Sequence, residues 1–288
     1  MSSLAIRPIT DADAQPCGRI LFEAFRRFHD HHRFPPDFQS LEEAVQLAEL
    51  FIGHPAIFGV VAEMDGRIVG SNFLDERNDM RGVGPITVDP DVQGQGVGRR
   101  LMDDVIFRGR DAAGIRLVQD GFNMRSLSLY ASLGFRPREP LVLLTGRPQE
   151  APPPEVEVRA LHEEDLEGCA ALCRRVHGFD RSRELRDAMA LFSPVVVRRA
   201  GEVTAYASAP SYWKLNHGVA ESDWHMQALL LGAARLTAQP LSMLLPVRHP
   251  GFLQWCLGQG FRAVKPMTLM TMGRYQDAVG CGFPSVLY

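Results

Sequence analysis

Six consecutive residues, Gln93–Gly98, have the composition and the setting of a phosphate-binding loop. The loop contains Gly94, Gly96 and Gly98, and it follows an apolar, strand-like stretch at 86–88 that ends at Asp89-Pro90. Apolar residues one turn apart after the loop, at 101–106, predict a helix. In a loop between a strand and a helix, successive backbone N–H groups converge on one point, and the helix start adds partial positive charge. Glycines let a ligand approach the backbone closely. The pattern therefore predicts the binding of a phosphate group.

Three kinds of phosphate loop have glycines of this sort. A Walker-type loop ends in Lys-Ser/Thr, but this one ends Gly98-Arg99-Arg100, which disfavours nucleotide hydrolysis. A dinucleotide fingerprint needs GxGxxG spacing with an acidic residue about 20 positions further on, and the glycine spacing here does not fit. The third pattern is Gln/Arg-x-x-Gly-x-Gly/Ala after a strand ending Val-x-Pro, which Val88–Pro90 and Gln93–Gly98 match throughout. The segment thus strongly resembles the acetyl-CoA loop of the GNAT acetyltransferase family.

The resemblance implies where the cofactor would lie. In the family, a mixed sheet splays open at the strand before the loop, and the pantetheine arm lies in the split. Thr87 and Val88 would offer backbone hydrogen bonds to the pantetheine amides. Arg99 or Arg100 would bind a phosphate by a charge-assisted hydrogen bond, and the sequence does not decide between them. The pyrophosphate would be cradled by the backbone amides of Gln93, Gly94, Gly96, Val97 and Gly98.

A second family motif lies at 123–130. Asn123 is expected to cap a helix, and in the family an asparagine here also contacts the cofactor. Tyr130 matches the family's tyrosine whose hydroxyl lies near the CoA sulfur, where an O–H donor stabilises and protonates the leaving thiolate. Judged on spacing alone, Tyr130 could equally be a core aromatic, because Leu127 and Leu133 lie on the same expected helix face.

The amine substrate must also lose a proton, which a carboxylate or a water chain usually accepts. Glu76 follows the second strand of a predicted hairpin, and we expect it to be the base or to orient a water. The alternative is an acidic surface turn.

The segment 25–38 holds the cluster His29–His32, but ligands on neighbouring residues point in different directions, so no metal is expected. The resemblance implies that this segment, which follows the first helix, lines the acceptor pocket with its aromatics and histidines, and packing of its Phe residues in the core is the alternative.

Three patterns recur in the same order along the chain, which indicates two copies of one fold. Each copy has a short strand followed by an acidic helix start, then a hairpin turned at glycine, then a helix ended by glycine before a strand. The corresponding segments are 6–13 and 158–165, 60–69 and 196–203, and 129–136 and 255–262. The fold class predicted is mixed α/β with two tandem GNAT-like domains, at 1–147 and 155–288, joined by a Pro-rich linker at 148–154.

The two copies differ at the places where chemistry is expected. Between Tyr206 and Arg235 the second copy holds only Gly218 and Gly232, which are too far apart to form a glycine loop. The position that matches Tyr130 is Cys256. We expect the second copy to have kept the fold and lost the cofactor site, serving as a wall of the substrate cleft or a dimer surface. The apolar C-terminal segment 280–288 is expected to pack against the first domain or another subunit.

Composition limits the function classes. A net charge of −3 argues against a nucleic-acid binder, and no apolar run approaches 18 residues, which argues against a membrane segment. Five cysteines without a CxxC pair favour a reducing, cytoplasmic setting. The expected partners are a small-molecule amine, since a second copy would narrow access, and a second chain in a homodimer.

The function predicted is acetyl-CoA-dependent N-acetylation of a primary amine by direct attack on the thioester. One rival is a non-catalytic acyl-CoA-binding protein that senses or scaffolds. A third hypothesis places the chemistry in the second domain with Cys256 as nucleophile, although no activating base is evident beside it.

Overall fold

The computed structural model describes residues 4–287, and it divides into two compact units. The first unit ends at Leu117 and the second begins at Val118, so the division falls inside strand β6 (Gly114–Asp120). Both units combine helices with β-sheet, and both contain antiparallel pairs. This confirms the predicted mixed α/β class. Among the described residues, no helix is long and apolar enough to cross a membrane.

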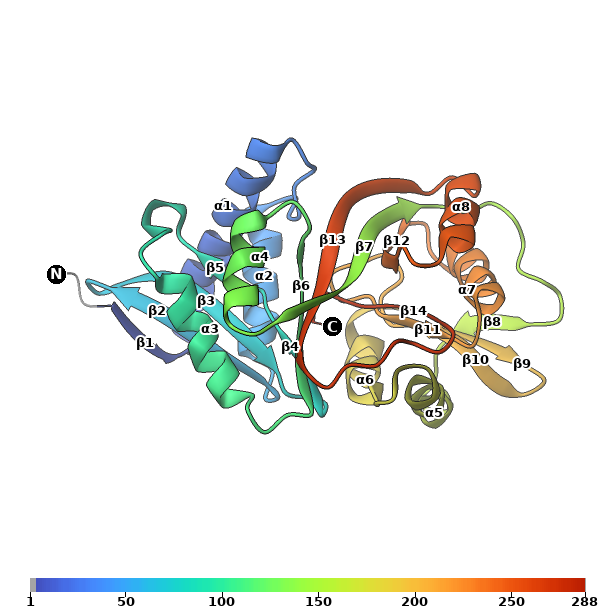
Figure 1. Cartoon of the computed structure of the whole chain (residues 1–288). Helices are drawn as coiled ribbons and strands as arrows, with labels where there is room; N and C mark the ends of the chain where they lie inside the picture. The colour runs from blue at the N-terminus through green and yellow to red at the C-terminus, as the bar shows by residue number, and fades with distance from the viewer. Residues whose placement is uncertain (1–3, 288) are drawn as a thin grey trace. The chain divides into compact units, whose positions relative to one another are not determined.

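The first unit is built on one sheet with strand order β1-β2-β3-β4-β6, and β5 is added to β3. The pairs are antiparallel except β4 with β6, which is parallel. Helices α1 and α2 pack against each other on one face of the sheet, and α3 covers the other (Figure 1). The elements are β1 (Leu4–Pro8), α1 (Ala14–His32), α2 (Leu41–Ile52), β2 (Ile57–Met64), β3 (Arg67–Asp75), β4 (Met80–Val83), β5 (Thr87–Val88) and α3 (Val97–Arg108), with short 3-10 turns at Asp11–Asp13 and Pro90–Val92.

The second unit contains a five-stranded sheet of order β14-β11-β10-β9-β8 and an antiparallel set of order β13-β7-β12. Helix α7 packs on the strands of the five-stranded sheet, and α5 packs on β10 and β11. Its elements are α4 (Met124–Ser132), β7 (Arg136–Gly146), β8 (Glu157–Ala160), α5 (Leu166–His177), α6 (Ser182–Leu191), β9 (Val195–Arg199), β10 (Glu202–Ala207), β11 (Gly218–Ala220), α7 (Asp223–Leu236), β12 (Leu241–Pro246), α8 (Pro250–Gly258), β13 (Arg262–Gly273) and β14 (Cys281–Phe283), with a 3-10 turn at Glu163–Asp165.

The internal repeat extends to individual side chains. Arg7 pairs with Asp13 at 2.7 Å, and Arg159 pairs with Asp165 at 2.6 Å, each between the first strand and the helix start of its copy. In both places the aspartate also accepts from a backbone N–H three residues earlier, which closes the turn. The β2–β3 and β9–β10 hairpins both turn through two residues with positive φ, at 65–66 and 200–201. The tandem organisation predicted from sequence is therefore present.

The third recurring pattern, a helix ended by glycine before a strand, also matches between the two copies. The N–H of Phe135 donates to the carbonyl of Tyr130, and the N–H of Phe261 donates to the carbonyl of Cys256, both at 3.0 Å. Each bond closes the end of a helix, α4 or α8, just before a glycine in the left-handed region. Cys256 therefore occupies the backbone position of Tyr130, as the sequence comparison predicted.

The compact units do not coincide with the sequence copies. Strand β7 belongs to the first copy by sequence, yet it pairs antiparallel with both β12 and β13, which come from the second copy. For this reason the division of the structure lies well before the predicted linker. Residues 148–154 form neither helix nor strand. The predicted domain bounds of 1–147 and 155–288 stay a prediction.

The C-terminal segment has a strand partner that the sequence did not predict, and its expected packing against the first domain or another subunit stays a prediction. Residues 281–283 form β14, which pairs with β11 inside the second unit, and Leu287 is also buried. Residues 281–283 thus pack within the second unit, and Tyr288 lies outside the described residues. An apolar segment that sequence reasoning places at an interface can complete the sheet of its own unit, because local pattern does not specify a strand's partner.

Candidate functional site

The glycine loop lies between β5 and α3, as its sequence predicted. Gly94 and Gly96 have φ values of 92° and 84°, a region in which residues with a side chain are strained. Residues 93–96 are all exposed, and a Cβ added at Gly96 would meet nothing within 4 Å. The loop therefore presents backbone to open space, with room for a large group beside it.

The loop ends at the start of α3, and this helix start has the features of an anion site. Gly96 is the N-cap, so the cap has no side chain that could accept a hydrogen bond from the first turn. The first N–H groups of any α-helix lack partners within the helix, and they carry its partial positive charge. No acidic residue lies in this turn, where Arg99 and Arg100 are exposed. Val97, Leu101 and Val105 are fully buried and fix the helix against the sheet.

Strand β5 has an unpaired edge next to this loop. Pairing of β4 with β6 ends at Gly82 and Arg116, whereas Thr87 and Val88 pair with β3 alone among the described strands. The sheet thus parts at β5, as the resemblance implied. The Thr87 side chain is buried and contacts the Ser71 hydroxyl at 3.3 Å, so this side chain is not available to a ligand.

Sequence reasoning missed Gly70, which shapes this edge, and the side-chain contact of Gln93. A Cβ at Gly70 would lie 2.7 Å from the carbonyl oxygen of Thr87, so only glycine lets β3 and β5 approach as they do. A glycine inside an apolar strand pattern is the signal that could have identified it. Gln93 donates from Nε2 to the carbonyl of Val88 at 3.1 Å. A carbonyl oxygen accepts two hydrogen bonds, so this contact leaves one lone pair of Val88 for a ligand.

Asn123 and Tyr130 lie on α4 in the second unit. Asn123 is the N-cap of this helix and accepts from the backbone N–H of Ser126 at 3.0 Å, which confirms the predicted cap. Tyr130 is 7% exposed and packs edge to face against Phe135. Burial, and then the charge of Asp120, raise the pKa of Tyr130 well above its ordinary value. The phenol therefore keeps its proton at neutral pH and can serve only as a donor or a weak acid.

The comparisons with known proteins agree with this geometry. Residues 19–135 match the family model described as Acetyltransferase (GNAT) family. These residues belong to the GNAT acetyltransferase family. The match includes β5, the glycine loop and the motif at 123–130. It ends within the first sequence copy. No curated protein matches the chain.

Solved structures extend the likeness to the whole chain. A putative acetyltransferase from Pyrococcus horikoshii is 18% identical, with 99% of this chain and 94% of that one covered and a TM-score of 0.77. A GCN5-related N-acetyltransferase from Sphaerobacter thermophilus is 14% identical, with 96% and 98% covered and a TM-score of 0.62. A tandem GNAT protein from the clavulanic acid biosynthesis pathway is 14% identical, with 98% and 100% covered and a TM-score of 0.58. At these identities the likeness shows a shared tandem GNAT fold.

Glu76 lies in the first unit of this GNAT fold, and its carboxylate is engaged. Arg81 reaches Oε1 at 3.1 Å, and Arg108 reaches Oε2 at 2.9 Å while its guanidinium lies over the ring of Phe58. Charge-assisted pairs of this kind hold both carboxylate oxygens in place. The assignment of Glu76 as base stays a prediction, and these ion pairs weigh against it.

The buried residues of the segment 25–38 pack in the core of the first unit. His29 is fully buried in α1, where Nδ1 lies 2.8 Å from the carbonyl of Phe25 and Nε2 lies 3.6 Å from Asp37. Phe25 packs edge to face against Phe38, which is also buried. His31 and His32 are exposed. The packing alternative for the Phe residues therefore holds for Phe38, and the acceptor-pocket expectation for the segment stays a prediction.

The second copy lacks the features that make the first an anion site. Only Glu221 and Ser222 connect β11 to α7, and the Ser222 side chain caps the helix by accepting from the N–H of His225. Asp223 places a carboxylate in the first turn of α7, where it pairs with His249 at 3.2 Å. Cys256 is completely buried, and this burial raises the pKa of its thiol to about 12. A thiol that keeps its proton is a poor nucleophile, which argues against the third hypothesis.

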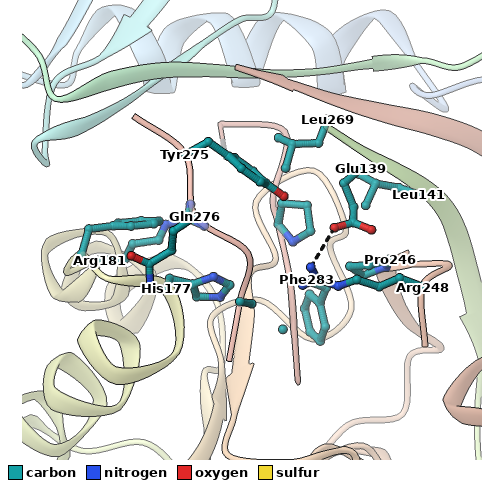
Figure 2. Close-up of a pocket in the computed structure, with 14 residues that line it drawn as sticks. Glu139, Leu141, His177, Arg181, Pro246, Arg248, Leu269, Tyr275, Gln276 and Phe283 are labelled. Carbon is teal, nitrogen blue, oxygen red and sulfur yellow. Dashed lines mark ion pairs between the residues drawn. The ribbon is translucent and has the colours of Figure 1, made fainter. Parts of the chain in front are cut away.

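A small cavity is present in the second unit (Figure 2). Glu139 and Arg248 face each other there at 3.2 Å, and burial raises the pKa of Glu139 although Arg248 opposes this. The cavity volume is about 30 Å³, which is space for a water molecule. We therefore assign no substrate to it. Its wall includes Gly282, Phe283 and Pro284 of the C-terminal tail.

Proposed function

We propose that the first copy of this protein transfers an acetyl group from acetyl-CoA to a primary amine, and that the acceptor is a small molecule. The observation that carries the proposal is the exposed glycine loop at the start of α3, beside the unpaired edge of β5. An anion site next to an open strand edge suits a ligand with phosphates at one end and amides along its arm. The family match of residues 19–135 supports the same reaction class.

In this proposal, backbone groups make most of the contacts that bind acetyl-CoA. The amides of Gln93, Gly94 and Gly96 to Gly98 would hold the pyrophosphate, and the exposed Arg99 or Arg100 would add a charge-assisted bond. The backbone of Thr87 and Val88 would pair with the pantetheine amides in the manner of an added strand. Asn123 keeps its family role beside the cofactor as part of the proposal, in addition to capping α4.

The chemistry needs little from side chains. Acetyl-CoA supplies an acetyl group activated as a thioester, and the amine nitrogen forms the new C–N bond as the C–S bond breaks. Backbone N–H groups along β5 would stabilise the charge that develops on the carbonyl oxygen. Tyr130 would stay protonated and donate a hydrogen bond to the departing thiolate, and it would pass on its proton only as a weak acid because burial raises its pKa. The proton lost by the amine leaves through water or a base, and Glu76 is our candidate only if its ion pairs open.

The first test is calorimetric titration of acetyl-CoA into the wild type and into Gly96→Glu. We expect one site per chain, abolished by a side chain and a negative charge in the loop. Gly251→Glu is the matched control, because a Cβ there also meets nothing within 4 Å. Absence of binding to a folded wild type would contradict the proposal.

A screen of primary amines with acetyl-CoA then separates an enzyme from a sensor. Release of free CoA that depends on one amine supports N-acetylation, and the size of the best acceptor tests the small-molecule part. Tight binding of acetyl-CoA with no turnover on any amine or peptide would favour a non-catalytic acyl-CoA-binding protein instead.

A further inference from the structure

Strand β11 of the second copy is the structural counterpart of β5. Thr87 and Val88 pair with β3 at Ser71 and Gly70, and Val219 and Ala220 pair with β10 at Tyr206 and Ala205. The next residue of each strand bonds in the same way, since Asp89 N–H donates to Val69 and Glu221 N–H donates to Thr204. Each strand then leads into a helix, α3 or α7. The residues equivalent to Thr87 and Val88 are therefore Val219 and Ala220.

The two strands differ on their other edge. Strand β5 has that edge unpaired among the described strands, but β11 pairs there with β14 from the C-terminal tail. Val219 lies opposite Gly282, and Ala220 lies opposite Cys281. Strand β14 also contacts β12 and α7, so it lies where β11 and β12 are not paired with each other in this copy. The backbone positions that would hold pantetheine in the first copy are thus used by the chain itself in the second.

The fit between tail and slot is close. A Cβ on Gly218 would lie 2.2 Å from the ring of Phe283, so β11 begins with a residue that leaves space for that ring. Phe283 is 2% exposed, and Figure 2 shows it among the residues that line the small cavity. Further along the tail, Ser285 Oγ accepts from Arg181 at 3.0 Å, and the Val286 N–H donates to the Lys214 carbonyl at 2.9 Å.

The end of the slot near α7 is also closed. The thiol of Cys281 is completely buried and hydrogen-bonds with the carboxylate of Asp223. Asp223 stands in the first turn of α7, which is where a pyrophosphate would meet the helix in a cofactor-binding copy. The helix start has a carboxylate and a serine cap in place of open N–H groups. A second anion there would be repelled.

We propose that the C-terminal segment 280–287 is the permanent occupant of the second copy's cofactor slot. The slot has become a peptide groove that binds the chain's own terminus by strand addition, anchored by Phe283. The second copy therefore binds no acyl-CoA. This proposal rests on the proposed function, because it assumes that the parting at β5 is where acetyl-CoA binds in the first copy.

The test uses the full chain with a protease site inserted after Asp277, whose side chain is 82% exposed. The folded protein is cleaved and passed through a native sizing column, and the C-terminal fragment is followed by mass spectrometry. We expect the fragment to stay with the protein and to exchange with an added synthetic peptide of the tail sequence. A scrambled peptide should not exchange.

Gly218→Ala in the cleavable chain should weaken retention of the fragment about tenfold, since its methyl group collides with the Phe283 ring. Gly251→Ala, with open space at its Cβ, is the matched control and should leave retention unchanged. If Gly218→Ala does not fold, Phe283→Ala removes the same contact from the other side and should lower retention similarly.

Loss of the fragment from a chain that stays folded would overturn the proposal. So would the binding of two acetyl-CoA molecules by the uncut chain, measured by calorimetry. Absence of acetyl-CoA binding with the fragment still retained is a different outcome. It contradicts the proposed function and the description of the slot as a former cofactor site, but not the docking of the tail in that slot.

Discussion

The connection from β5 to α3 and the connection from β11 to α7 occupy equivalent places in two copies of one fold. The first is an exposed glycine loop that ends at a helix start with no side-chain cap. The second has two residues, a serine cap and an aspartate in the first turn. Beside the first, the strand edge is unpaired, and beside the second it is covered by β14. A shared backbone fold therefore does not imply a shared ligand, because the site depends on a few residues at one helix start.

The largest effect is expected at the paired positions Tyr130 and Cys256. Tyr130→Phe should lower kcat by about 10²- to 10³-fold and leave the Kd of acetyl-CoA unchanged, because it removes only the proton donor. Cys256→Ala makes a change of similar size in the second copy and should leave kcat unchanged. Steady-state kinetics and calorimetry on both variants measure the difference. Equal effects would mean that the two copies do not differ in the way we describe.

The next effect tests the helix starts. Gly98→Asp gives α3 a carboxylate in its first turn, as Asp223 gives α7, and should weaken acetyl-CoA binding about a hundredfold through repulsion of the phosphates. The loss should shrink at high salt, because screening weakens the repulsion of exposed charges. Gly98→Asn is the neutral control. If both variants bind equally, charge at this helix start does not distinguish the copies.

Both copies share an arginine–aspartate pair, which gives a third prediction. The hydrogen bond from Arg7 lowers the pKa of Asp13 to about 2. The folded-state pKa lies below the ordinary value of 3.8, so the pair stabilises the fold above that pH and this stability is lost as pH falls toward about 2. Asp13→Asn should lower the free energy of unfolding by about 2 kcal/mol at neutral pH and flatten its decline in acid.

The twin pair provides the comparison for this measurement. Burial acts to raise the pKa of Asp165, but bonds from Arg159, the His162 N–H and Arg198 outweigh it, and the pKa is lowered. Asp165→Asn should thus shift acid unfolding in the same direction as Asp13→Asn. If the two substitutions shift acid unfolding in opposite directions, the two arginine–aspartate pairs share their geometry but not their effect on stability. Urea unfolding between pH 2 and 7 is the measurement.

The smallest effect is expected at Glu76. Because Arg81 and Arg108 hold both carboxylate oxygens, Glu76→Gln should lower kcat/KM by less than about tenfold and should not remove the acid limb of the pH–rate profile. Glu49→Gln, on exposed α2 surface, is a control for charge alone. Loss of the acid limb together with a fall of a hundredfold or more would restore Glu76 as the base.

Local sequence patterns predicted much of the fold. The turn at Asp65-Gly66, the cap at Asn123 and the glycine loop all lie where the sequence placed them, because each depends on residues close in the chain. The partners of β7 and β14 were not predictable in this way. Their pairing joins segments far apart in sequence, and an apolar strand pattern does not say which edge it will meet. The ion pairs of Glu76 could not be predicted from the sequence for the same reason.

The pairing of β7 with β12 has a consequence for how the chain is made. During synthesis, β7 emerges about 95 residues before the start of β12, which is on the order of 5 to 20 s of translation. Over that interval an apolar strand has neither of its two sheet neighbours, and unpaired strand edges are where nascent chains aggregate. Separate expression of the two sequence copies, cut at the linker, would make that interval permanent. The linker marks a repeat boundary in the sequence and is a poor place to cut the protein.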